Sequence, residues 1–174
     1  MSALCLEFTV LTAARSGEAL GARWDEINLD TKLWVLPRER MKRNREHRVP
    51  LSDRSVDILR VLEQMKTGAE SYVFPGTKAD KPLSVMALEM LLRRMKQAVT
   101  VHGFRSTFRD WAGDCTTISR EIVEEALSHQ VGSEVERSYR RGDALEKRRQ
   151  LMQMWADYCA AEKFDNVIAI HAAG

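Results

Sequence analysis

The most informative stretch of this chain reads Leu11-Thr12-Ala13-Ala14-Arg15-Ser16-Gly17-Glu18-Ala19-Leu20. It overlaps the end of an apolar segment, residues 3–14, which we expect to form a buried helix. Ser16 is placed to cap a second, short helix that has Glu18 in its first turn. Arg15 therefore stands between two helices, and Glu18, three residues on, can orient its guanidinium. On its own, such an arginine is more typical of a surface cation than of an active site.

Five further polar residues complete a set that suits metal-free phosphoryl transfer: Lys42, His102, Arg105, His129 and Tyr139. Pairs of arginines bind non-bridging phosphate oxygens through paired donors. Tyrosine can act as a covalent nucleophile, and lysine or histidine can move protons to the attacking and leaving oxygens. Tyr139 lies ten residues beyond His129. Three arginines flank it, and their positive field favours the phenolate: Arg137, Arg140 and Arg141.

The local sequences around these residues resemble the catalytic domain of the tyrosine recombinases, the phage-integrase family. Residues 11–20 are similar to the arginine box of that family, and residues 41–52 resemble its β-hairpin lysine followed by a Val-Pro-Leu strand. Three further boxes of the family match, in order, His102-Gly103-Phe104-Arg105, Leu127-Ser128-His129 and Ser138-Tyr139-Arg140. The closing segment, residues 148–158, is similar to integrases of prophages and genomic islands in particular. The resemblance covers roughly residues 5–160.

The resemblance implies a site-specific DNA recombinase that integrates and excises prophages or genomic islands without a metal, ATP or another cofactor. Tyr139 would attack the scissile phosphate and form a 3′-phosphotyrosyl link, and Lys42 would protonate the departing 5′ oxygen. The two arginines and His129 would hold the developing negative charge, and His102 would transfer protons and position the phosphate. The implied catalytic set is Arg15, Lys42, His102, Arg105, His129 and Tyr139. Further DNA contacts are expected from Arg43, Arg45, Arg48, Arg140 and Arg141.

The expected architecture follows from the same resemblance. We expect a mainly α fold with a small antiparallel β-sheet (α+β), and residues 1–174 as a single C-terminal catalytic domain without the arm-binding and core-binding domains of the family. The implied partners are double-stranded DNA attachment sites, a homotetramer on DNA and accessory DNA-bending proteins, with the isolated fragment a monomer. Family members often exchange C-terminal segments, and the helix expected over residues 143–160 could do so or pack on its own domain.

Composition is compatible with this interpretation. A chain of 174 residues with 44% hydrophobic content can bury one sizeable core. The net charge of +2 does not by itself indicate a nucleic-acid partner. Two basic clusters lie beside the candidate site residues: residues 38–48 carry six Lys or Arg against two Glu, and residues 137–149 carry six against two acids. Two solvated faces would explain these clusters equally well.

The cysteines and the hydropathy pattern bear on location. Three cysteines stand far apart without metal-ligand spacing, which indicates reduced thiols in a cytoplasmic protein: Cys5, Cys115 and Cys159. The resemblance implies that this cytoplasm is bacterial and that the protein associates with the nucleoid. No apolar run approaches the roughly 20 residues needed to span a membrane, so no membrane partner is expected.

The pattern along the chain predicts the remaining elements. A turn at residues 28–31 precedes a strand over residues 33–36, which ends at Pro37, and residues 48–51 are its expected partner, with a basic hairpin arm between them. Ser52 or Asp53 is expected to cap a helix whose inner face carries Val56, Leu59, Leu62 and Met65. Further helices are expected over residues 84–99, 104–112, 118–127 and 143–160. A departure from the family is Ala13, where glycine is common.

Several residues have competing interpretations. Lone histidines are usually satisfied structural residues, and a metal site would need a third ligand that no nearby Cys or carboxylate supplies to His102 and His129. Tyr72 and Tyr158 lie among apolar neighbours, which favours packing over catalysis. Lys42 is flanked by arginines, and such runs usually contact phosphates without specificity. We assign no chemistry to the two other histidines: His47 and His171.

Three other functions compete with recombination. A type IB topoisomerase-like strand transferase would use nearly the same chemistry. A non-catalytic DNA-binding domain would account for the basic clusters but would not need the six-residue set. A metal-dependent nuclease would need clusters of acidic ligands, which the sequence does not present.

Overall fold

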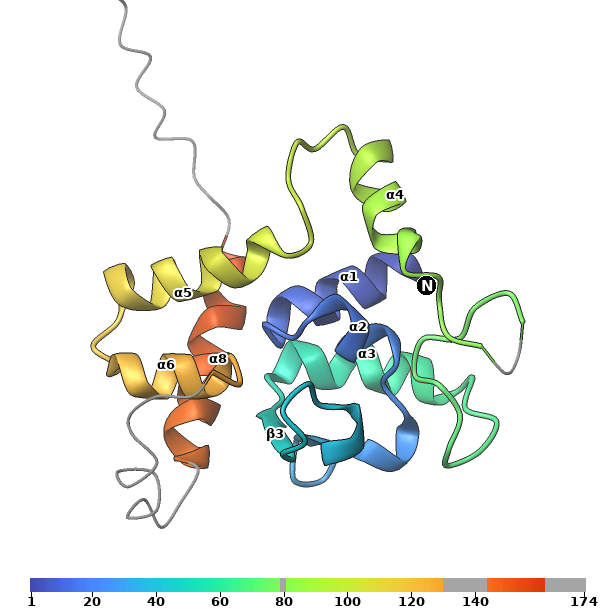
Figure 1. Cartoon of the computed structure of the whole chain (residues 1–174), viewed down its shortest axis with the longest axis horizontal. Coiled ribbons are helices and arrows are strands. Elements are labelled where there is room, and N and C mark those ends of the chain that lie inside the picture. The colour runs from blue at the N-terminus through green and yellow to red at the C-terminus, as the bar shows by residue number, and fades with distance from the viewer. Residues whose placement is uncertain (79–80, 130–143, 162–174) are drawn as a thin grey trace, which may run out of the picture.

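The computed structural model describes residues 1–78, 81–129 and 144–161 (Figure 1). The fold is mainly helical with a three-stranded antiparallel sheet, which confirms the predicted fold class. In chain order the elements are α1 (Ser2–Leu11), α2 (Ser16–Leu20), η1 (Trp24–Glu26), β1 (Ile27–Asn28), β2 (Leu33–Leu36), η2 (Arg38–Arg40), β3 (His47–Pro50), α3 (Asp53–Glu63), α4 (Met86–Arg94), α5 (Gly103–Cys115), α6 (Arg120–Ala126) and α8 (Leu145–Ala160).

The sheet has β2 at its centre, with β1 and β3 on either side. Trp34 of β2 pairs with Ile27 and with Val49, so the buried indole stands in the middle of the sheet. The β1–β2 turn forms where predicted, because the Asn28 side chain accepts a hydrogen bond from the backbone of Thr31 at 2.8 Å. β1 itself was not predicted, since a strand of two residues carries no alternation that a sequence pattern could show.

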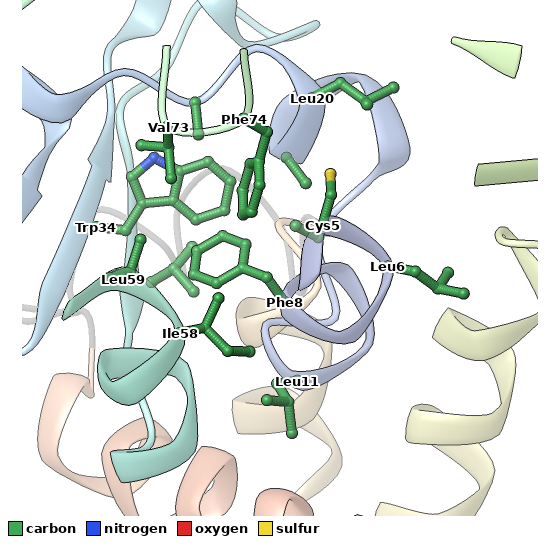
Figure 2. Packing of buried hydrophobic residues seen from close by; sticks show 14 of the residues in the cluster. Cys5, Leu6, Phe8, Leu11, Leu20, Trp34, Ile58, Leu59, Val73 and Phe74 are labelled. Carbon is green, nitrogen blue, oxygen red and sulfur yellow. The ribbon is translucent and has the colours of Figure 1, made fainter. Parts of the chain in front are cut away.

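The first hydrophobic core lies between α1, the sheet and α3. Figure 2 shows Phe8 of α1 packed against Trp34 and Phe74, and the Phe8 ring centroid lies 5.4 Å from each of the other two. Burying one such ring contributes about 1.5–3 kcal/mol. Arg15 lies four residues after the end of α1, so this core fixes the position of the segment that carries Arg15.

A second core lies between α5, α6 and α8, which stand together on one side of the molecule (Figure 1). Phe108 and Trp111 of α5 pack against Trp155 of α8, with ring centroids at 5.5 Å and 5.0 Å from that indole. Trp155 also joins this core to α1, because its Nε1 donates a hydrogen bond to the Val10 carbonyl at 2.8 Å. Tyr158 stacks on Trp155, so its packing role is confirmed although 45% of it is exposed.

An arginine in α8 ties this helix to the sheet. Arg148 is fully buried, and its Nη1 donates a hydrogen bond to the Arg48 carbonyl of β3 at 2.6 Å. Nη1 of Arg149 donates to the Lys32 carbonyl at 3.3 Å. The α8 helix therefore packs on β3 and α1 of the same chain.

Several helix boundaries differ from the prediction. Ser52 caps α3 as expected, but Met65 lies beyond the helix end and is 58% exposed, so its predicted core position was wrong. The helix predicted over residues 84–99 ends at Arg94, because Lys96 takes a left-handed conformation with φ of 55°. The α5 helix starts near the predicted residue but continues to Cys115, three residues further than predicted. None of the described helices is both long enough and apolar enough to cross a membrane.

Candidate functional site

Arg15 is held by the acid that follows it. It is the N-cap of α2, so the prediction that Ser16 is the cap was wrong. The carboxylate of Glu18 performs the capping instead, because Oε2 accepts a hydrogen bond from the Arg15 backbone at 2.9 Å. Oε1 of the same group accepts from Arg15 Nη1 at 2.7 Å. The predicted orientation of Arg15 by Glu18 is confirmed, and the arginine side chain stays 35% exposed.

Arg105 is buried between α1 and α6. Only 7% of it is exposed, its Nη2 donates a hydrogen bond to the Leu127 carbonyl at 2.7 Å, and its Nη1 donates to the Ala13 carbonyl. Ala13 has a φ of 48°, in the left-handed region, where glycine is favoured. A guanidinium carries five N–H donors, so these two bonds leave donors for an anion.

The fold brings the two arginines close together although they stand ninety residues apart in the chain. Burial and, to a smaller extent, the positive charge of Arg15 together lower the pKa of Arg105 to about 10, while Glu18 partly opposes the change. The group therefore remains charged at neutral pH. Within the described ranges no carboxylate forms an ion pair with Arg105. Two neighbouring guanidiniums of this kind favour the binding of a doubly coordinated anion such as a phosphate.

His129 lies at the end of α6, two residues beyond the carbonyl that Arg105 binds. The chain turns there through Ser128, which has a φ of 55°. His129 Nδ1 lies 2.6 Å from Oε2 of Glu124, whose carboxylate is buried, and the imidazole itself is exposed. The hydrogen bond from Arg105 to Leu127 therefore links that guanidinium to the segment that carries His129, and the catalytic role of His129 stays a prediction.

The other predicted catalytic residues differ in how the structure places them. Lys42 is exposed in the hairpin arm between η2 and β3. His102 is the N-cap of α5 and is exposed, whereas Arg105, three residues further on, is buried. Its backbone precedes the first turn of α5, and the packed face of the helix begins only with the next residues.

The residues predicted to contact DNA lie partly in the hairpin arm, partly in β3 and partly outside the described residues. Arg43 and Arg45 are exposed in the hairpin arm, and Arg48 lies in β3. Three predicted residues lie outside the described ones: Tyr139, Arg140 and Arg141.

His47, whose sequence context indicated no chemistry, lies close to Arg105 and Glu18. Burial lowers its pKa to about 4, and the charges of Arg148 and Arg105 act in the same direction. Glu18 and a hydrogen bond with the backbone of Ala126 oppose this change. A neutral imidazole therefore joins the start of β3, at the base of the Lys42 arm, to the end of α6. In the sequence, only its position just before the Val-Pro-Leu strand could have pointed to His47.

His47 makes the stability of the chain depend on pH. The pKa of His47 is about 4 in the folded chain against an ordinary value of 6.5. Between these two pH values, His47 binds a proton only in the unfolded chain. We expect stability to fall as the pH drops through this window, by about 3 kcal/mol in full, since one pKa unit is worth about 1.4 kcal/mol. Urea unfolding of the wild-type chain and of His47→Gln at pH 7.0 and at pH 4.5 measures this loss of stability. The wild type should lose more stability than the variant, and equal losses would contradict the assignment.

No group of three or more His, Cys, Asp or Glu side chains suited to hold a metal ion is found among residues 1–78, 81–129 and 144–161.

The amino-acid sequence of the chain is similar to those of known proteins. The phage integrase family matches residues 1–146 of the chain. The prophage integrase IntA of Escherichia coli (strain K12) is 37% identical over 175 residues, which cover 98% of this chain and 42% of IntA. The chain belongs to the phage integrase family. The integrase of Enterobacteria phage P4 is 35% identical, over 91% of this chain and 40% of that protein.

A solved structure agrees with this family at the level of the fold. An integrase from mycobacterium phage Brujita superposes with a TM-score of 0.64 and 17% identity, over 87% of this chain and 50% of that one. The resemblance to the phage-integrase family is thus confirmed, as is the fold that it implied. The chain spans about two fifths of the length of the curated relatives IntA and the P4 integrase.

Proposed function

We propose that this chain is the catalytic domain of a site-specific tyrosine recombinase that integrates and excises a prophage or genomic island. The observation that carries the proposal is that Arg105 lies close to Arg15 and binds the Ala13 and Leu127 carbonyls, which stand two residues before Arg15 and His129. These three side chains come from the start of α2, from α5 and from the end of α6. A cluster of two arginines and a histidine with no described carboxylate on Arg105 suits a phosphate diester better than it suits packing.

The reaction that we propose is a transesterification. The phenolic oxygen of Tyr139 attacks the scissile phosphorus, a P–O bond forms to the tyrosine, and the bond to the 5′ oxygen breaks. Arg15, Arg105 and His129 bind the non-bridging oxygens, whose negative charge grows in the pentacovalent intermediate. The phosphodiester energy is kept in the 3′-phosphotyrosyl bond, so rejoining by a 5′-hydroxyl needs no ATP. A 5′-hydroxyl from a partner strand completes strand exchange.

We assign protonation of the leaving 5′ oxygen to Lys42. Its position in an exposed arm supports this role, because a lysine on such an arm can meet a DNA strand laid across the arginine pair. Arginine is a poor proton donor, whereas lysine can act as a general acid, so the neighbouring Arg43 and Arg45 are better suited to hold the DNA backbone. His102, exposed at the start of α5, assists in proton transfer and positioning.

The proposed partner is double-stranded DNA at an attachment site, with four protomers assembled on two sites. Core-binding and arm-binding domains would precede this domain in the full recombinase. The exposed basic side chains of the hairpin arm, together with the partly exposed Arg15 and the buried Arg105, support a DNA-facing surface on this domain.

An adduct-trapping assay tests the proposed chemistry without knowledge of the target sequence. Supercoiled plasmid is incubated with the wild-type chain in EDTA, stopped with SDS and separated with and without protease. We expect relaxed or nicked DNA and a protein-linked band, and the DNA-linked peptide should contain Tyr139 by mass spectrometry. Loss of activity in EDTA, or a link to another residue, would contradict the proposal. Firm DNA binding without an adduct would favour a non-catalytic DNA-binding domain.

A further inference from the structure

Glu124 is a buried carboxylate that the proposed reaction does not use. It lies in α6, with 7% of the residue exposed, and carboxylates are rarely buried unless they are paired. Its neighbours come from three places in the chain. Oε2 lies 2.6 Å from His129 Nδ1, and Oε1 lies 2.7 Å from Nε of Arg109 on α5. A third cation, Arg120, is 3.9 Å away and 79% exposed, too distant to hold the carboxylate in place.

The contact with His129 determines which ring nitrogen faces outward. An ionised carboxylate can only accept a hydrogen bond, so Nδ1 of His129 must carry the proton that it shares with Oε2. The two ring nitrogens are separated by one carbon and point outward in widely different directions, so Nε2 is turned away from Glu124. The backbone reinforces this placement, because the His129 N–H donates to the Glu124 carbonyl at 2.8 Å.

The contact with Arg109 joins the same carboxylate to the helix that carries Arg105. Arg109 and Arg105 are four residues apart on α5 and so lie on one side of it. The N–H of Arg109 does not point at Oε1, which has no hydrogen bond among the described residues, so their contact is an ion pair without a directed bond. Arg105 binds the Leu127 carbonyl and Arg109 binds Glu124, so two arginines of α5 hold the C-terminal end of α6, just before the turn to His129.

We propose that Glu124 is the positioning residue of His129: it holds Nδ1, turns Nε2 toward the phosphate between the two arginines, and fixes the ring to α5 through Arg109. The inference rests on the proposed recombinase function for its catalytic consequence, whereas the orientation of the ring is a property of the folded chain alone. A carboxylate behind a histidine commonly fixes the ring and its tautomer in this way.

Nitrogen NMR on the whole chain labelled with ¹⁵N-histidine tests the orientation directly. At pH 8, where histidine side chains are ordinarily neutral, His129 should show the tautomer protonated at Nδ1. His129→Asn identifies its signals among the four histidines. Glu124→Ala should shift His129 toward the tautomer protonated at Nε2. The isosteric Glu124→Gln, whose amide oxygen still accepts the hydrogen bond, should retain the wild-type tautomer, and Glu125→Gln is the matched control on the same helix.

Cleavage of supercoiled plasmid at saturating protein concentration tests whether the orientation of His129 by Glu124 affects the rate of adduct formation. Glu124→Ala should slow adduct formation about 10- to 100-fold, with DNA affinity within about twofold of wild type, and Glu124→Gln should recover most of the rate. Arg109→Gln should slow it less, and Arg120→Gln should have no effect. An unchanged His129 tautomer in Glu124→Ala would overturn the proposal, as would equal losses of rate and DNA affinity. If the wild-type chain formed no adduct, the recombinase function would fail while the NMR result would still decide the role of Glu124.

Discussion

Tyr139→Phe is expected to form no SDS-stable adduct with DNA while binding DNA as tightly as the wild-type chain. The phenylalanine ring keeps the shape of the side chain but lacks the oxygen that becomes bonded to phosphorus. Removing a covalent nucleophile costs more than about 10⁴-fold in rate in well-studied enzymes, so the adduct should fall below detection. The measurement is adduct trapping in EDTA beside a fluorescence-anisotropy titration with labelled duplex DNA.

The two other tyrosines supply matched controls. Tyr72 lies with its ring 5.0 Å from the guanidinium of Arg23, and Tyr158 stacks on Trp155 at 5.7 Å. Neither contact involves the candidate site, so Tyr72→Phe and Tyr158→Phe should both form the adduct at close to the wild-type rate. A persistent adduct in Tyr139→Phe, together with its loss in either control, would move the nucleophile to another tyrosine and contradict the proposed mechanism.

Local features of the fold were predictable because short stretches of sequence determine them. Ser52 caps α3, Pro37 follows the end of β2, and Glu18 orients Arg15, all through interactions that span no more than three residues. The end of α4 was not predictable in the same way. The apolar pattern continues past Arg94, and the left-handed turn at Lys96 depends on backbone geometry that no residue type there demands.

The candidate site was predictable in its membership but not in its geometry. The resemblance selected Arg105, yet its environment depends on two carbonyls that lie 92 and 22 residues away in the chain. A sequence pattern does not show that a left-handed Ala13 directs its carbonyl at that guanidinium. His47 and Glu124 were missed for the same reason: each gains its importance from neighbours on other elements, and neither stands at a spacing that indicates chemistry.

Arg105→Ala is expected to reduce adduct formation by about 10³-fold or more, because an arginine that binds the oxygens of a transferring phosphate contributes on that scale. Arg105→Lys keeps the charge but cannot bind two carbonyls and a phosphate at once, so we expect a loss of about 10²-fold. Arg93→Ala, on the exposed side of α4, should change neither activity nor stability. Rates of adduct formation at saturating protein provide the comparison.

The effect of Arg105 on stability must be separated from its effect on chemistry. Removing the guanidinium leaves the buried Ala13 and Leu127 carbonyls without a described donor, and an unsatisfied buried group costs about 1–3 kcal/mol. Removing a buried charge returns part of this cost, so we expect a net loss of about 2 kcal/mol by urea unfolding. A domain with an unfolding free energy of about 5 kcal/mol or more would stay over 99% folded after such a loss. Unfolding could then account for almost none of a thousandfold decrease in rate. A folded Arg105→Ala chain that forms adduct within tenfold of the wild-type rate would therefore show that this arginine supports the fold and not the phosphate.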